Sequence, residues 1–163
     1  MKTTQRQIVA EIAPVPANEQ AGHRQGPSVL PSTVNGTKYF ATVSGGEISA
    51  AVEKIYDGNS KFPDVLCAPA EIGDITVSKF YDENSDKDFL NQIRQIVGQT
   101  YYDVTIYTLN CDLEENDSMR NYPRCLLVGL SDIDGDASSG APSAFSLTFA
   151  VSQLAPAELT SLA

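Results

Sequence analysis

Residues 132–136 read Asp-Ile-Asp-Gly-Asp, and this alternation of carboxylates is the first pattern in the chain that suggests chemistry. A calcium loop of the EF-hand type takes oxygen ligands at positions 1, 3 and 5, then needs Gly at 6 and Glu at 12. Ala137 and Ser143 stand at those last two positions. We therefore interpret the segment as an acidic turn between two strands. A metal-dependent hydrolase that uses Asp132 or Asp134 is the catalytic alternative.

Nucleophilic catalysis by serine or cysteine needs a nearby general base, and the chain contains few candidates for one. A serine or cysteine nucleophile is deprotonated by a neighbouring histidine, and the sequence contains one histidine, His23, with no Gly-x-Ser-x-Gly elbow. A phosphate-binding loop would place a lysine after its glycines, whereas Gly45 and Gly46 are followed by Glu47. We predict that the protein is not an enzyme and binds no cofactor or metal.

The cysteines do not follow a metal-binding or redox spacing. Cys67, Cys111 and Cys125 are far apart, and no CxxC motif occurs. An odd number of cysteines without a recognisable secretory signal favours reduced thiols. Whether Cys111 and Cys125 are adjacent across a hairpin is left open by the pattern.

Composition excludes several classes of protein. The chain has 163 residues, enough for one ordinary domain, and is 42% hydrophobic. Its formal net charge of −10 argues against a broad basic surface that grips nucleic acid. No apolar stretch approaches the roughly 20 residues of a membrane span, so we expect no membrane insertion. The first residues do not have the pattern of a secretory signal.

The chain divides by composition near residue 36. Residues 1–36 contain four of the nine prolines, and proline removes a backbone donor and restricts the residue before it. We interpret this segment as an extended N-terminal arm without a regular helix or central strand, and ordinary N-terminal disorder is the alternative. Residues 37–163 form the second, β-rich part.

Alternating apolar residues predict antiparallel strands through most of that second part. A helix over residues 47–56 is the alternative for the first hairpin, because Glu, Ala and Lys are good helix formers. The expected strands and hairpins, in chain order, are residues 39–43, a long hairpin of 47–56 with 65–67, then 74–81, a second hairpin of 102–109 with 120–130, and 143–152.

One convincing helix interrupts the strands. Phe89, Leu90, Ile93, Ile96 and Val97 form a single stripe at 3.6 residues per turn. We place the helix at residues 87–97, with Ser85 as the N-terminal cap, and interpret the acids before it as capping residues rather than a metal site.

The order of these elements resembles that of the tail tube (major tail) proteins of tailed bacteriophages. The resemblance covers roughly residues 38–153 and rests on three quoted pieces. These are Val-Ser-Gly-Gly-Glu at 43–47, Gly-Asp-Ile-Thr-Val-Ser-Lys-Phe-Tyr-Asp at 73–82 before the helix, and Asp-Gly-Asp-Ala-Ser-Ser-Gly at 134–140 before the last strand.

The resemblance implies a mainly β fold, a β-sandwich or barrel of antiparallel strands flanked by one α-helix. It also implies a structural virion protein that forms hexameric rings, stacked into the hollow tail tube through which DNA is delivered to the host. The implied partners are further copies of the chain and the tape-measure, tail-tip or baseplate and tail-terminator proteins. DNA would pass transiently and without sequence preference. The implied location is the virion tail, assembled in the host cytoplasm.

The same resemblance suggests two groups of site residues. Acids on candidate strands, Glu47, Glu53 and Asp103, are candidates to line the lumen, where negative charge would repel passing DNA. Candidate contacts between rings are the N-terminal arm and the hairpin loop. The loop residues are Asp57, Gly58, Asn59, Ser60, Lys61 and Phe62.

Two alternatives to a phage tail tube remain at this level. One is a secreted or surface β-sandwich binding module of the adhesin type. The other is the tube protein of a related injection or secretion machine.

Overall fold

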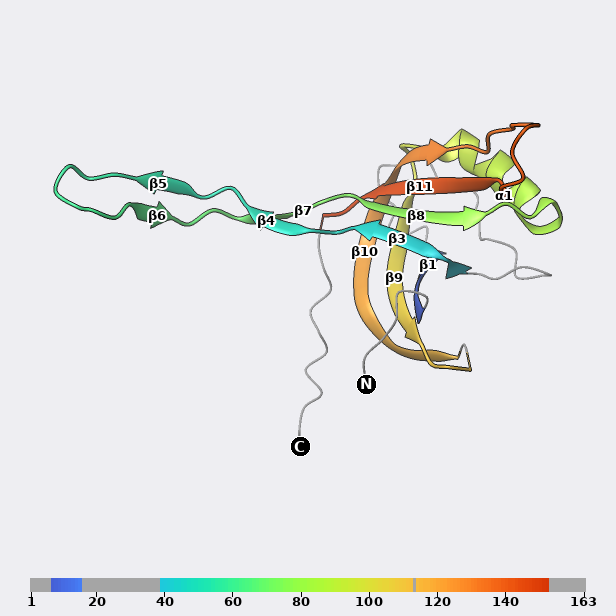
Figure 1. Ribbon diagram of the computed structural model, residues 1–163, viewed down its shortest axis with the longest axis horizontal. Helices are drawn as coiled ribbons and strands as arrows, with labels where there is room; N and C mark the ends of the chain where they lie inside the picture. The colour runs from blue at the N-terminus through green and yellow to red at the C-terminus, as the bar shows by residue number, and fades with distance from the viewer. Residues whose placement is uncertain (1–6, 16–38, 113, 153–163) are drawn as a thin grey trace.

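The computed structural model describes residues 7–15, 39–112 and 114–152 of the chain, and within these ranges it is mainly β with one helix (Figure 1). The elements in chain order are β1 (Ile8–Pro14), β2 (Tyr39–Phe40), β3 (Thr42–Gly45), β4 (Ile48–Ala50), β5 (Glu53–Ile55), β6 (Asp64–Leu66), β7 (Ala70–Ile72), β8 (Ile75–Phe80), α1 (Glu83–Ile96), β9 (Tyr101–Leu109), β10 (Glu115–Ser131) and β11 (Ala144–Ala150). The predicted mainly β fold class is confirmed.

Seven of the strands form one antiparallel sheet that closes on itself. Its order is β2-β1-β9-β10-β11-β8-β3. The strands at the two ends of this order, β2 and β3, are separated in sequence only by Ala41. Residues 39–45 therefore pair with β1 through their first part and with β8 through their second. The sheet is therefore a barrel closed by this one segment, in which β2 pairs with Ala10 and Glu11 of β1.

The core fills the barrel and extends under the helix. Alternate residues of β9 and β11, among them Tyr102, Val104, Leu147 and Phe149, are almost completely buried, as period-two patterning requires. Phe89 of α1 packs against Phe145 with ring centroids 6.3 Å apart. The helix thus covers one end of the barrel, the end away from the projecting hairpin (Figure 1).

The helix begins earlier than its apolar stripe predicts. It starts at Glu83 rather than residue 87, and its cap is Asp82, whose carboxylate accepts a hydrogen bond from the Asn84 amide at 3.0 Å. Ser85, the predicted cap, is buried inside the first turn. The first turn is polar and is held by a hydrogen bond to the Asp86 carboxylate instead of by apolar contacts. The apolar periodicity of the sequence therefore did not predict it.

The N-terminal segment contains a central strand, contrary to the sequence interpretation. β1 lies between β2 and β9 and pairs with β9 over its whole length, from Ile8 to Pro14. Pro14 is the first proline of the chain and the last residue of β1, so the strand comes before the part of the sequence where the prolines gather. Deleting residues 1–36 would therefore remove a barrel strand, so such a deletion cannot test whether the N-terminal segment contacts a neighbouring ring. Residues 1–6 and 16–38 lie outside the described part, and the division near residue 36 stays a prediction.

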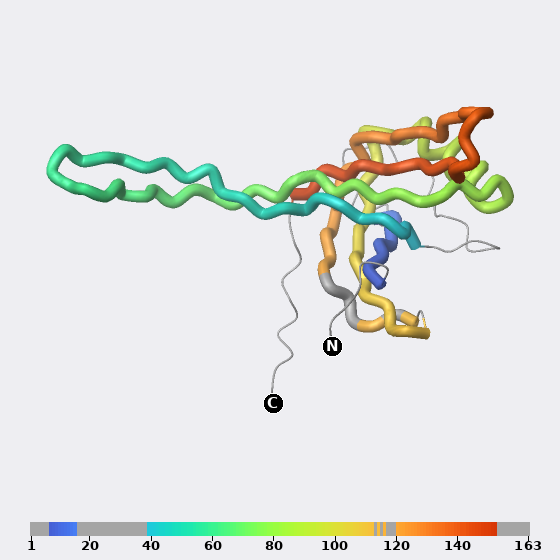
Figure 2. The backbone as a smooth tube through the Cα atoms, in the orientation of Figure 1, coloured from blue at the N-terminus to red at the C-terminus, as the bar shows by residue number. Residues whose placement is uncertain are grey.

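The long hairpin predicted from residues 47–56 and 65–67 is confirmed as strand rather than helix, and it extends to residue 73. β4 pairs with β7 and β5 with β6, and both pairs stand apart from the barrel sheet. We call residues 47–73 the arm. It projects away from the barrel as an extended two-stranded ribbon (Figure 2).

We expect Gly45→Ala to destabilise the point where the arm leaves the barrel. Gly45 has φ of 92°, and a Cβ there would lie 2.0 Å from the carbonyl oxygen of Asp74. The left-handed conformation alone costs about 1–3 kcal/mol for a residue other than glycine. Urea unfolding followed by circular dichroism measures the loss. Gly58→Ala at the arm tip, where nothing lies within 4 Å, is the matched control and should change little.

Candidate assembly surface

The arm exposes large apolar side chains along its length. Phe62 is 78% exposed, Tyr56 71% and Ile48 59%. Val52, Ile55, Val65 and Leu66 are also exposed. An isolated two-stranded hairpin is only marginally stable in water, and exposed apolar patches of this kind mark interaction surfaces. The arm is therefore the part of the described chain that most clearly lacks a partner within the subunit.

Glycines and backbone hydrogen bonds fix the root of the arm. Gly45 and Gly46 both have positive φ, 92° and 74°. The Gly46 amide donates to the Asp74 carbonyl at 3.3 Å, and the Gly73 amide donates to the Glu47 carbonyl at 2.8 Å. Gly46 also packs on Tyr122 of the barrel, because a Cβ there would lie 2.9 Å from the Tyr122 hydroxyl. The arm thus leaves the barrel in a defined direction.

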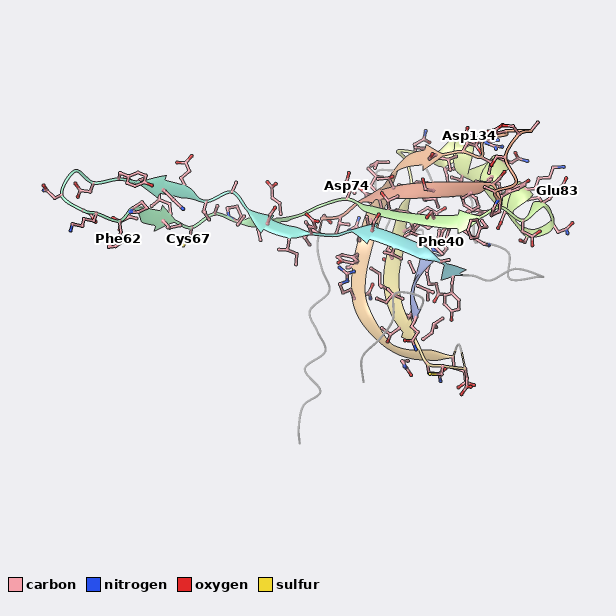
Figure 3. The ribbon with its side chains drawn as sticks, in the orientation of Figure 1. Phe40, Phe62, Cys67, Asp74, Glu83 and Asp134 are labelled. Atoms are coloured by element: carbon pink, nitrogen blue, oxygen red, sulfur yellow. The ribbon has the colours of Figure 1, made fainter. Side chains whose placement is uncertain are left out.

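The predicted ring-contact residues lie together at the tip of the arm. The Ser60 amide donates to the Asp57 carbonyl at 2.9 Å, and the Ser60 hydroxyl donates to the Phe62 carbonyl at 2.8 Å. Asp57, Gly58, Asn59, Ser60, Lys61 and Phe62 are all exposed. Figure 3 shows Phe62 on the arm, far from Asp74 at its root.

The three acids predicted to line a lumen do not share one surface. Glu47 is exposed at the arm root and Glu53 is exposed on β5, out along the arm. Asp103 is half-buried on β9 of the barrel, and its carboxylate accepts a hydrogen bond from the Arg124 amide at 3.0 Å. Within one subunit, therefore, these acids form no cluster. Their role as lumen residues stays a prediction.

Hydroxyl side chains form a continuous face on the outside of the barrel. The register places Thr76 of β8 beside Thr148 of β11, with their oxygens 3.4 Å apart. Ser44 pairs with Thr76 across β3 and β8. We call the following exposed or half-buried residues the hydroxyl face: Thr42, Ser44, Thr76, Ser78, Ser131, Ser146 and Thr148. The face carries no charged side chain and is suited to contact water.

The acidic segment 132–136 is a loop between β10 and β11, as predicted. Asp132 binds Arg94 of α1 through two hydrogen bonds, Nε–Oδ2 at 2.6 Å and Nη2–Oδ1 at 2.9 Å. These bonds lower the pKa of Asp132 and raise that of Arg94. Hydrogen bonds from Ser138 likewise lower the pKa of Asp136. Among the described residues, no group of three or more His, Cys, Asp or Glu side chains is placed to hold a metal ion.

The cysteines are free thiols and do not pair. Cys67 and Cys111 are exposed, whereas Cys125 is buried opposite Tyr102. Cys111 follows β9 in the turn toward β10, so it is not the cross-strand neighbour of Cys125. Burial raises the pKa of the Cys125 thiol to about 12, which keeps it protonated and unreactive at neutral pH.

Arg120 is a polar residue that the sequence interpretation did not single out. It stands on β10 opposite Ile106, and its guanidinium reaches the Tyr122 hydroxyl beneath the arm root. Its place follows from a break in the register between Ser118 and Arg120, and such irregularities leave no clear pattern in the sequence.

None of the helices in the described part is long and apolar enough to span a membrane.

Comparison with known proteins gives similarity at the level of structure only. No protein-family model matches the sequence, and no curated protein matches it. A chain from the PVC sheath–tube complex of an extracellular contractile injection system, in the extended state, is similar with a TM-score of 0.64 and 17% identity. The alignment covers 94% of this chain and 89% of that one.

Two further structures agree with this. A chain of the anti-feeding prophage baseplate has a TM-score of 0.65 at 14% identity, with 94% of each chain covered. A chain of the PVC sheath/tube terminator in the extended state has a TM-score of 0.63 at 16% identity, covering 94% of this chain and 95% of that one. The chain therefore has a fold found in components of phage-like contractile injection particles.

Proposed function

We propose that the chain is a subunit of the tube of a phage-like tail or injection particle, and that it acts by assembly rather than by catalysis. The observation that carries the proposal is the arm. Its apolar side chains are exposed in the single subunit, and an isolated two-stranded ribbon is only marginally stable in water. Contact with another molecule would bury these side chains and stabilise the ribbon. The likeness to components of contractile injection particles supports the same role.

The assembly that we propose is a stack of hexameric rings around a hollow lumen. Copies would join through side-chain surfaces of the barrel and through the arm, whose apolar side chains are exposed. The arm would bridge neighbouring subunits, with its tip residues 57–62 in contact with the next ring. The hydroxyl face is a candidate lining for the lumen, because a conduit needs a wetted wall that does not hold its cargo.

The cargo that we propose is DNA of a tailed phage, with the cargo of a related injection machine as the second possibility. Six copies at −10 would give a ring a charge of about −60, which repels a polyanion and prevents it from sticking. Tape-measure, baseplate or tip, and terminator proteins would complete such a tail. The assembled particle would be the site of function, and the host cytoplasm the site of assembly.

Negative-stain electron microscopy of the purified, untagged protein at rising concentration tests the proposal. We expect rings or hollow filaments of one uniform width. Because each subunit is strongly acidic, raising the salt concentration from about 50 to about 500 mM should lower the concentration needed, since salt screens repulsion between exposed charges. Monodisperse particles at every concentration and salt would contradict a tube subunit.

A further inference from the structure

Arg120 lies at the root of the arm, and its guanidinium makes one hydrogen bond within the described part of the chain. Its Nη1 donates a hydrogen bond to the Tyr122 hydroxyl at 3.1 Å, and its guanidinium carbon is 5.8 Å from the centre of the Tyr122 ring. The Nε atom is buried and has no hydrogen-bond partner among the described residues. The Tyr122 hydroxyl itself lies under Gly46, so this cation is fixed beside the point where the arm leaves the barrel.

Arg94 shows what the same group does when a carboxylate is present. Its Nη1 donates to the Asn91 side chain at 2.7 Å, while Nε and Nη2 bind the two oxygens of Asp132. Arg120 has the first of these contacts, with Tyr122 in place of Asn91, and lacks the second in the described part of the chain. A guanidinium can bind a carboxylate in two parallel hydrogen bonds through Nε and Nη2, as in Arg94, or through its two outer nitrogens, Nη1 and Nη2.

We infer that Arg120 is a carboxylate-binding site, and that an acid on the arm of a second copy of the chain occupies it in the assembled tube. The inference rests on the proposed function. The Nε atom is shielded within the subunit, so the incoming carboxylate would bind the outer nitrogens Nη1 and Nη2 of the guanidinium. In a chain of net charge −10, a cation held at the arm root is also a place where two acidic subunits attract each other.

The arm has the complementary charge. Residues 47–73 contain five carboxylates and two lysines, which gives a net charge of −3. Glu53, Asp57 and Asp64 are exposed on its outer part and make no ion pair with a described residue. Glu53 and Asp64 stand on β5 and β6, with Asp57 in the turn between them, and these strands lie far from β10, which carries Arg120 (Figure 1). The three acids can therefore meet an Arg120 only on another copy.

Two neutralising variants test the site by a filament-pelleting assay. Arg120→Gln should raise the concentration needed for filaments by about tenfold or more, because it removes one partner of a desolvated charge pair. The arm variant E53Q/D57N/D64N should do the same. Because its three residues are exposed, this variant should fold, so it tests the site even if Arg120→Gln fails to fold. The control D88N/D112N/D134N makes the same change in net charge at exposed sites off the arm.

Whether the arm variant raises or lowers the concentration needed for filaments shows whether the arm acids attract or repel neighbouring subunits. If the arm acids only repel neighbouring subunits, neutralising them lowers the concentration needed, as we expect for the control. The reversed pair, Arg120→Glu together with E53K/D57K/D64K, should assemble better than Arg120→Glu alone. Variants that assemble as the unmodified chain does, or reversal without rescue, would overturn the inference while leaving the tube role standing. Absence of filaments from the unmodified chain would instead defeat the proposed function.

Discussion

Excising residues 49–71 and joining Ile48 to Ile72 through an Asn-Gly turn should give a folded monomer that no longer forms filaments. Every residue of β4, β5 and β6 is exposed, and Ile72 at the root is the arm residue that packs against the core. The excision therefore removes almost no buried surface from the subunit. It removes all of the exposed apolar side chains between residues 52 and 66.

The expected size of the effect differs greatly between folding and assembly. Closing a shorter loop costs slightly less entropy, so the free energy of unfolding should stay within about 1 kcal/mol of the original. The concentration needed for filaments should rise at least about 100-fold, equivalent to about 2.8 kcal/mol per subunit added, because a few buried apolar anchors dominate most interfaces. Urea unfolding and filament pelleting measure the two quantities on the same preparations.

A milder variant locates the contact within the arm. Replacing residues 57–62 by a two-residue turn keeps β5 and β6 but removes Phe62, the most exposed large apolar side chain at 78%. If the tip contacts the next ring, this variant should also fail to form long filaments while single rings remain visible by electron microscopy. Normal filaments from the full excision would show that the arm is not an assembly element.

Local patterns were sufficient to predict the strands of the barrel other than β1, and those of the arm. Ile75 and Val77 point inward while Thr76 and Ser78 point outward, as their alternation indicates. The arm was recognisable because polar turn residues separate two short β runs. In each case the information lies within about ten neighbouring residues, where side-chain period and turn chemistry act.

Pairings between distant segments were not predictable in the same way. β1 precedes two dozen residues rich in proline, and the presence of β9 as its partner is what makes it a strand. Closure of the barrel depends on Ala41, where one segment passes from pairing with β1 to pairing with β8. Arg120 became a candidate site only because a register shift turns it toward Tyr122. These features depend on long-range register, which a single sequence does not reveal.

Asp86→Ala should destabilise the subunit more than any surface change. Asp86 is completely buried, and its carboxylate accepts hydrogen bonds from Lys79 Nζ at 3.0 Å and from the Asp82 amide at 2.9 Å. The Lys79 side chain is 10% exposed, so the substitution leaves a poorly solvated ammonium without its counter-ion. Removing one member of a buried ion pair typically costs about 3–5 kcal/mol. The free energy of unfolding, measured in urea by circular dichroism, should fall by that amount.

A second ion pair of similar geometry supplies the control and shows why burial decides the outcome. Arg94 and Asp132 lie as close together, at 2.6 Å, but their side chains are 42% and 40% exposed. Asp132→Ala should therefore cost only about 0–1 kcal/mol, since water solvates the arginine that remains. Replacing both members of the buried pair, K79M/D86L, should recover most of the loss, because no isolated charge is left behind. Equal effects of Asp86→Ala and Asp132→Ala would mean that α1 is held to the barrel by its apolar face, with Phe89 in contact with Phe145 of β11, and not by the Lys79–Asp86 pair.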